Sequence, residues 1–202
     1  MKRIASTAFA AAALGLAAGA HAQTLRFASQ GDPQTMDPHS QNESFTNSVN
    51  QQVYQYLVNR DKQLNLVPEL ATSWEQLSPL KWRFKLRQGV KFHDGSAFNA
   101  DDVVFSIIRA QQPTSQIAVY ANAIGTPKKI DDFTVEFEMT KVNPIFMEHI
   151  QPVFIMDKEW SEKNKATKPQ DFKNKEEMHT ALNANGTGPF MLVKREPGIK
   201  TT

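Results

Sequence analysis

The sequence has no cysteine among its 202 residues, so disulfides and thiolate metal ligands are excluded. The same absence excludes a lipid anchor on an N-terminal cysteine. None of the five histidines has a second histidine at the spacing of helical metal ligands, so scattered histidines are the simpler interpretation. A metal site assembled from distant segments stays open, and we expect neither a metal nor a cofactor.

Sequence patterns of catalysis are also lacking. The stretch "GTGPF" (186–190) has no Lys-Ser/Thr of a phosphate-binding loop, and no Gly-x-Ser-x-Gly elbow nominates a serine nucleophile. The acid pairs at 101–102 and 131–132 are explained by a helix start and a turn. We therefore expect a protein that is not an enzyme.

Charge is missing from the first part of the chain after Arg3. Residues 4–19 form an Ala-rich apolar run, and Ala20-His21-Ala22 places small residues where signal peptidase cleaves. We interpret residues 1–22 as a signal peptide cleaved after Ala22. Its removal lowers Lys+Arg from 23 to 21, equal to the 21 acids, and no later run is apolar enough to span a bilayer. With no cysteine for a lipid anchor, a periplasmic location is the expectation.

The mature chain begins with patterns of alternating element type. Leu25–Ser29 reads as a short strand, followed by a polar loop that Pro33 and Pro38 keep irregular. From Ser44 onward the spacing of apolar residues predicts an amphipathic helix. Its apolar positions are Phe45, Val49, Val53, Tyr56 and Leu57.

Residues 69–77 and 81–87 predict a β-hairpin around Ser78-Pro79-Leu80. In the second strand Trp82, Phe84 and Leu86 alternate with a row of basic residues. A basic row is also found on nucleic-acid-binding sheets, but no aromatic platform shares this face and the mature charge is near zero. We therefore expect no nucleic-acid partner and a wet outer face of an antiparallel sheet.

Turn and cap residues mark the next elements. Asp94-Gly95 predicts a turn, and Asn99 predicts the N-cap of a helix that ends before Pro113. The apolar face of this helix is formed by Val103, Val104, Ile107 and Ile108. We expect a loop that carries Tyr120 after this helix, then a second alternating strand at residues 128–141 and a helix at residues 175–184. The charged stretch 162–177 predicts a solvated surface segment, and residues 187–198 predict a strand and a turn before the start of another strand.

The stretch from 82 to 106 resembles the signature of the family-5 solute-binding proteins, the extracytoplasmic receptors of dipeptide, oligopeptide and nickel ABC importers. The matching residues are Trp82, Phe84, Leu86, Arg87, Val90, Phe92, Asp94, Gly95, Phe98, Ala100, Asp101, Asp102, Val103 and Ser106. The stretches "DPQTMDPH", "LVPELATSWE" and "TGPFMLVKREPG" resemble other segments of that family in the same order. The resemblance covers residues 24–199.

The resemblance implies an α/β fold with two lobes that close on a solute and a small subdomain beside the first lobe. On this view residues 23–202 are the N-terminal lobe, with the small subdomain at roughly 45–180. Family members run to more than twice this length, so the second lobe is missing from the sequence. We expect a C-terminally truncated chain, a monomer, that binds peptide weakly or not at all.

The resemblance also nominates contacts to the solute. Asn42, Glu43 and Ser44 occupy the place that faces the cleft in this family, and Tyr120 matches an aromatic residue that borders the peptide in relatives. The alternative is that residues 42–44 only cap the next helix and that Tyr120 is an ordinary half-buried tyrosine.

Three functions remain in view. The first is the peptide-binding component of an ABC importer, with a permease in the inner membrane as partner. The second is a vestigial or interaction-only lobe that captures no solute. The third, an exported hydrolase, has no motif to support it. The solute itself, whether dipeptide, oligopeptide, nickel chelate or haem, is not encoded in any motif that we find.

Overall fold

The computed structural model describes residues 28, 29 and 31–202 of the chain. Its residues cluster into two units, Met1–Gln30 and Gly31–Thr202, and the second contains all the helices and strands that the structure describes. The predicted signal peptide and most of the strand predicted at Leu25–Ser29 lie outside the described residues. Ala28 itself has no regular secondary structure.

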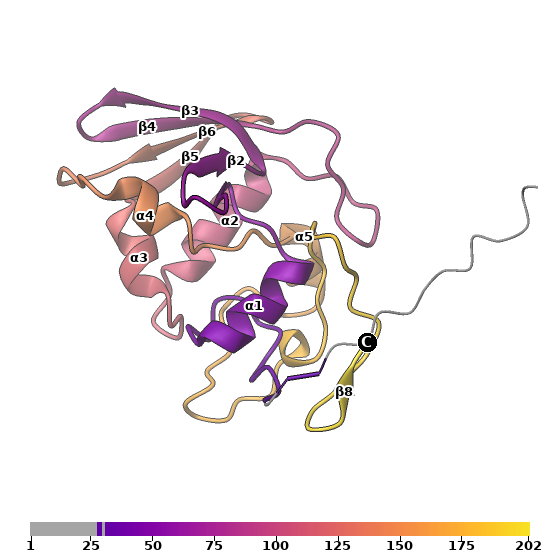
Figure 1. Ribbon diagram of the computed structural model, residues 1–202. Helices are drawn as coiled ribbons and strands as arrows, with labels where there is room; N and C mark the ends of the chain where they lie inside the picture. The colour runs from indigo at the N-terminus through magenta and orange to yellow at the C-terminus, as the bar shows by residue number, and fades with distance from the viewer. Residues whose placement is uncertain (1–27, 30) are drawn as a thin grey trace, which may run out of the picture. The chain divides into compact units, whose positions relative to one another are not determined.

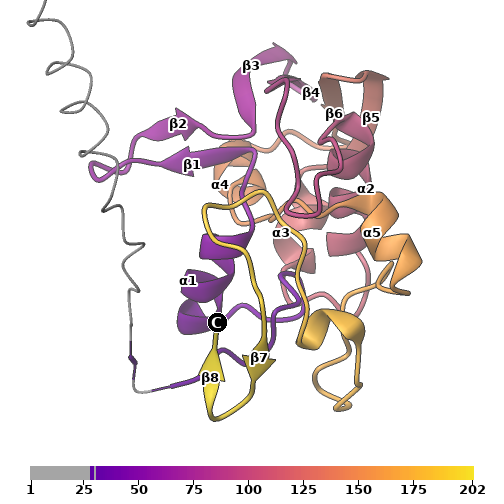
Figure 2. The ribbon, with the colours of Figure 1, turned by 90° about the vertical axis from the view of Figure 1, so that its right-hand side faces the viewer.

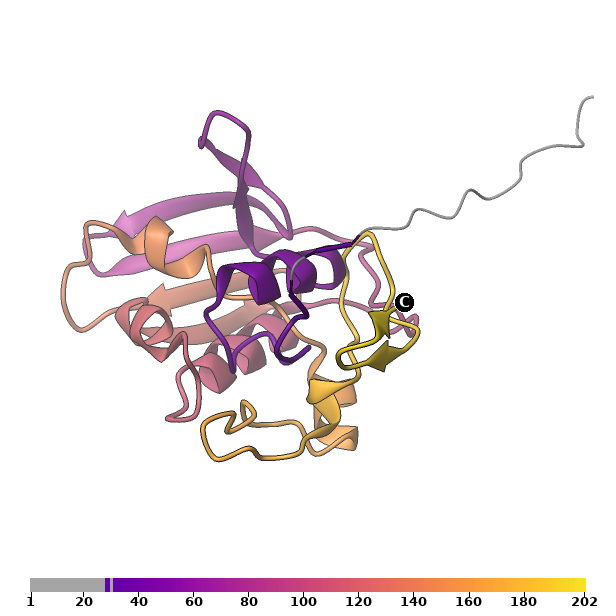
Figure 3. The same ribbon diagram turned by 60° about the horizontal axis from the view of Figure 1, so that its bottom comes forward.

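The largest sheet of this unit is four-stranded and antiparallel and lies at the upper left of Figure 1. The strands follow the spatial order β3 (Ala71–Ser78), β4 (Lys81–Leu86), β6 (Thr134–Glu138) and β5 (Thr126–Asp131). The β3–β4 pair is the predicted hairpin, with Trp74 opposite Phe84. A second hairpin, β1 (Val58–Arg60) with β2 (Leu66–Pro68), forms its own two-stranded sheet and projects at the top of Figure 3.

The alternation of the β4 sequence divides the two faces of the sheet as predicted. Phe84 and Leu86 are buried, and the indole of Trp82 stacks on Phe146 with ring centroids 5.1 Å apart. On the opposite face Arg83 bonds Glu136 of β6 at 2.5 Å and approaches Glu75 of β3 at 3.6 Å. Lys81 and Arg83 of the basic row are therefore compensated by acids of the neighbouring strands.

Helices cover the apolar face of the sheet. They are α2 (Ala100–Ala110), α3 (Ala118–Ala123) and α4 (Phe146–Ile150), as Figures 1 and 2 show. Asn99 caps α2 as predicted and shares a reciprocal capping box with Asp102. On the predicted apolar face of α2, Val103 and Ile107 are buried, but Ile108 is about half exposed.

The sheet and its helices enclose one large apolar core. Its fully buried aromatic and long aliphatic side chains include Phe84, Phe98, Phe137, Phe146, Leu57, Leu70, Ile107 and Ile117. Each contributes about 1.5–3 kcal/mol when buried in full. A second, smaller core gathers around α1 (Ser44–Val53), where the rings of Tyr56 and Phe154 stack at 4.3 Å.

The C-terminal third is less regular than predicted. Instead of a helix over 175–184, only a 3₁₀ turn forms, η1 (His179–Ala181), after a short helix α5 (Lys158–Lys163). The predicted strand in 187–198 is reduced to β7 (Arg195–Glu196), which pairs with β8 (Lys200–Thr201) in a separate hairpin (Figure 2). None of the helices in the described residues is long and apolar enough to cross a membrane.

Candidate solute-binding surface

The loop that precedes α1 is buried, although it has a polar sequence. Residues 35–40 are all buried, and each must satisfy its polar groups without water. Some of these hydrogen bonds are local, because the Thr35 hydroxyl accepts from the Asp37 amide and the Asp37 carboxylate accepts from the His39 amide. Such short side-chain turns are what Thr and Asp favour. The other hydrogen-bond partners of the loop come from distant segments.

A fully buried ion pair anchors the loop to α2. The guanidinium of Arg109 contacts both carboxylate oxygens of Asp37, at 3.0 Å and 2.5 Å, and neither side chain is exposed. Arg109 also donates to the carbonyls of Ala166 and Lys168 and to Nδ1 of His39. All five N–H donors of a guanidinium are thus used.

The Asp37 carboxylate is equally saturated. Besides Arg109 it accepts from the His39 amide, the Gln170 amide at 3.1 Å and the Thr180 hydroxyl at 2.8 Å. Burial by itself raises the pKa of Asp37, but the charge and hydrogen bonds of Arg109 outweigh it and bring the pKa to about 2. The prediction that the charged stretch 162–177 is a solvated segment is therefore wrong at Gln170, which is buried against this pair.

His39 is buried in the same network. Its Nε2 lies 2.9 Å from the Phe154 carbonyl, and its Nδ1 lies 3.1 Å from Arg109. Burial, together with the Arg109 charge, lowers the pKa of His39 to about 3. The imidazole is accordingly neutral at physiological pH.

The three residues predicted at the end of this loop begin α1. Glu43 is the N-cap, and its carboxylate accepts from the Phe45 and Thr46 amides at 2.8 and 2.7 Å, which lowers the pKa of Glu43. Asn42 and Ser44 are exposed beside it. The capping role that sequence alone left as the alternative is therefore present at Glu43, and a contact with solute stays a prediction.

Tyr120 lies in the first turn of α3, not in the loop that the sequence predicted. It is half-buried against the large core, and its ring lies 6.0 Å from that of His149. The segment that leads into α3 lies against the loop before α1 (Figure 1), because the His39 carbonyl accepts from the Gln116 amide at 2.9 Å. The fold thus brings together the two segments that carry the predicted contact residues.

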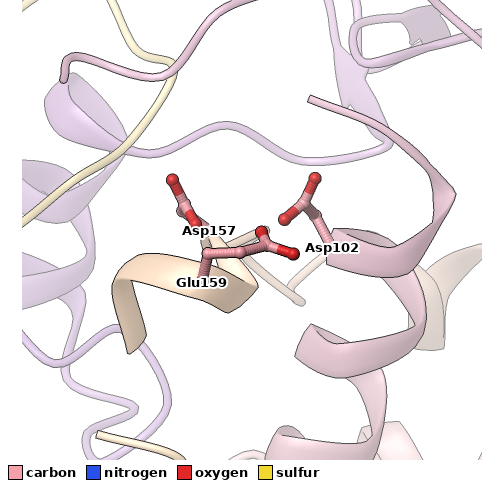
Figure 4. Close-up of side chains that lie close together, drawn as sticks. All are labelled: Asp102, Asp157 and Glu159. Atoms are coloured by element: carbon pink, nitrogen blue, oxygen red, sulfur yellow. The ribbon is translucent and has the colours of Figure 1, made fainter. Parts of the chain in front are cut away.

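Three other acids lie close together at the starts of α2 and α5 (Figure 4). Carboxylate oxygens of Asp102, Asp157 and Glu159 lie within 4.8 Å of one another. Asp102 accepts from the amides of Asn99 and Lys158, while Asp157 caps α5 and accepts from Ser96. These bonds give both buried acids a structural role at a helix start.

The buried network was not predicted from the sequence. A signal existed, since Arg109 is the only basic residue of α2 and stands next to its apolar face. An arginine at such a position needs an acid partner if it is buried. Nothing in the sequence identified that acid as Asp37, which is 72 residues away.

Comparison with known proteins agrees with this fold. A family model described as "Bacterial extracellular solute-binding proteins, family 5 Middle" matches residues 65–202. The chain therefore belongs to the family-5 bacterial extracellular solute-binding proteins, as the resemblance predicted. The α/β fold of this family is likewise confirmed by the solved structures that it matches.

Particular relatives cover most of this chain but only part of their own length. The dipeptide-binding protein of Escherichia coli (strain K12) is 33% identical over an alignment of 205 positions, which covers 89% of this chain and 37% of that protein. Glutathione-binding protein GsiB of Pectobacterium atrosepticum is 34% identical over 126 residues, covering 60% and 24%. The structure of NikZ from Campylobacter jejuni in complex with Ni(L-His) aligns with a TM-score of 0.68 at 26% identity, covering 80% and 31%.

Proposed function

We propose that this protein is the periplasmic binding component of an ABC importer and that its solute is a peptide. Its membership of the family-5 solute-binding proteins carries this proposal. Two of the relatives described above are named for peptides, the dipeptide-binding protein and glutathione-binding protein GsiB. The chain spans about a third of the length of such relatives, so it supplies one part of the surface that would hold the peptide.

The chemistry of the surface supports a peptide. Asn42, Ser44 and Tyr120 offer an amide and two hydroxyls, groups that both donate and accept hydrogen bonds. Peptide backbones need both kinds of partner, and a few placed polar groups are enough to orient a small ligand. Asn42 and Ser44 are exposed, so solute can reach them without any change in the fold.

Location and partners form part of the proposal. Residues 1–22 would direct export and be cleaved after Ala22, and the mature monomer would deliver its solute to a permease in the inner membrane. Intact mass spectrometry of the protein taken from the periplasm tests the cleavage site. A mature N-terminus at Gln23 supports it, and a retained N-terminus contradicts it.

Thermal unfolding with three separate probes tests the solute class. The probes are a mixture of dipeptides, reduced glutathione and the Ni(II)–histidine complex. At 100 times its dissociation constant a ligand stabilises by about 2.7 kcal/mol, which raises the Tm of a domain of this size by about 5–11 °C. We expect the dipeptides to give this shift. No shift with any probe would favour the interaction-only alternative, and a shift with Ni(II)–histidine alone would favour a metal chelate.

Variants at the surface sharpen this test. Asn42→Ala and Tyr120→Phe should reduce the shift caused by dipeptides. Because Asn42 is exposed, its substitution should leave the Tm of the ligand-free protein unchanged. Ser73→Ala, an equally exposed change on β3, is the matched control and should leave the shift intact. Equal shifts in all variants would remove these residues from the binding surface.

A further inference from the structure

His39 joins the two segments of the proposed solute-binding surface. Its carbonyl accepts from the Gln116 amide at 2.9 Å and from the Ser115 hydroxyl at 3.2 Å, just before the helix that carries Tyr120. Its own chain continues over four residues into Ser44, the first residue of α1. The residue itself is completely buried.

The ring of His39 is held at both nitrogens by partners that allow one arrangement only. Arg109 can only donate, so Nδ1 must be the acceptor, and the Phe154 carbonyl can only accept, so Nε2 must carry the proton. The neutral Nε2–H tautomer satisfies both bonds. A flipped ring or a second proton would break the bond to Arg109, so the ring cannot rearrange while the network is intact.

Arg109 belongs to α2, and Phe154 belongs to the segment between α4 and α5. The position of His39 is therefore set by α2 and by the segment between α4 and α5. The His39 main chain leads directly into residues 40–44 and hydrogen-bonds Ser115 and Gln116, so its position affects both surface segments. Groups that are held in their binding geometry before a ligand arrives lose less conformational freedom on binding.

We infer that His39 is a positioning residue for solute binding, which fixes residues 40–44 and the Ser115–Tyr120 segment relative to each other. This inference rests on the proposed function. It differs from a purely structural role in what it predicts, because loss of the His39 ring should weaken solute binding even in protein that is still fully folded.

Two substitutions at His39 and one matched control test the inference. His39→Leu removes both ring hydrogen bonds, whereas in His39→Asn the amide oxygen can take the place of Nδ1 and keep the bond from Arg109. Val135→Ala, in the fully buried middle of β6, removes core packing without touching the loop and is the control for lost stability. Hydrogen exchange of the peptides spanning 40–47 and 115–121 is measured below the Tm of every variant, together with dipeptide affinity by calorimetry.

Loss of two buried hydrogen bonds should speed exchange in both segments by about tenfold or more and weaken dipeptide binding by a similar factor. His39→Asn should recover part of both effects, and Val135→Ala should show neither. Exchange that rises in one segment only, or affinity that is unchanged in His39→Leu, overturns the inference.

The proposed function can fail separately. If the unaltered protein binds none of the dipeptides, glutathione or Ni(II)–histidine, the proposed function is refuted and the solute role of His39 falls with it. The exchange measurement still decides whether His39 couples the two segments. Coupled exchange without any binding would leave His39 as a structural link alone.

Discussion

Breaking the buried pair between Arg109 and Asp37 should be among the most damaging single changes in this protein. In Arg109→Met the Asp37 carboxylate stays buried without its counter-ion, while the carbonyls of Ala166 and Lys168 each lose a donor. Removal of one partner from a buried pair costs about 3–5 kcal/mol. For a domain of this size that corresponds to a fall in Tm of about 6–20 °C.

The double-mutant cycle with Asp37→Asn separates the ion pair from its surroundings. Each single variant leaves one uncompensated buried charge, and the double variant leaves none. We therefore expect the loss of unfolding free energy in the double variant to be smaller than the sum of the two single losses by at least about 2 kcal/mol. Urea denaturation at pH 7, with the midpoint and slope fitted for all four proteins, gives the required free energies of unfolding.

An exposed pair provides the control. The Lys194 ammonium lies 2.9 Å from Glu196, but its side chain is 64% exposed. Lys194→Met should cost less than about 1 kcal/mol, as surface pairs do. If Arg109→Met costs no more than Lys194→Met, or if the Arg109 and Asp37 effects add, the two residues do not form a coupled buried pair and the prediction is refuted.

Three further outcomes follow from other parts of the fold. The folded-state pKa of His39 is lowered from 6.5 to about 3, so the free energy of unfolding should fall by about 1.4 kcal/mol per pH unit as pH drops from 6.5 to 4. Burial raises the pKa of Asp102 from 3.8 to about 7, so the contribution of Asp102 to stability should fall as pH rises over nearly the same range. The two trends oppose each other, so the urea midpoint of the unaltered protein should change little between pH 4, 5.5 and 7. In His39→Asn only the Asp102 trend is left, and the midpoint should fall with rising pH. Identical profiles in the two proteins would contradict the pKa shifts of both His39 and Asp102. Asn99→Ala should cost about 1 kcal/mol of unfolding free energy by loss of the α2 cap, which a denaturant melt resolves. Gly125→Ala should destabilise more than Gly89→Ala, since both have positive φ but an added Cβ at Gly125 would lie 2.2 Å from the Glu138 carbonyl oxygen, and equal Tm values would contradict this.

Local features of the fold could be predicted from the sequence because their causes lie within a few residues. The strict alternation of β4 divides its apolar and basic side chains between two faces whatever the sheet packs against. The turn at Asp94-Gly95 requires a residue with positive φ, and Gly95 has a φ of 94°. The Asn99 cap and its partner Asp102 are three residues apart.

The errors lie where tertiary contacts override local preference. Residues 175–184 have a helical composition, but the Thr180 hydroxyl bonds Asp37 and the Ala181 carbonyl accepts from the Met36 amide, so these groups hold the chain in another path. Lys175 adopts a φ of 56°, which a helix does not allow. Local propensity had no information about either contact.

The sequence by itself determined the family, the sheet hairpin and the capped helix, and it predicted Asn42, Glu43, Ser44 and Tyr120 as contacts to the solute. Only the tertiary structure decided that these two segments meet, because their contact runs through the buried His39. The pairing of Arg109 with Asp37 likewise joins residues 72 positions apart. Periodicity and turn chemistry act over a few residues, whereas the choice of partner for a buried charge depends on how the whole chain packs.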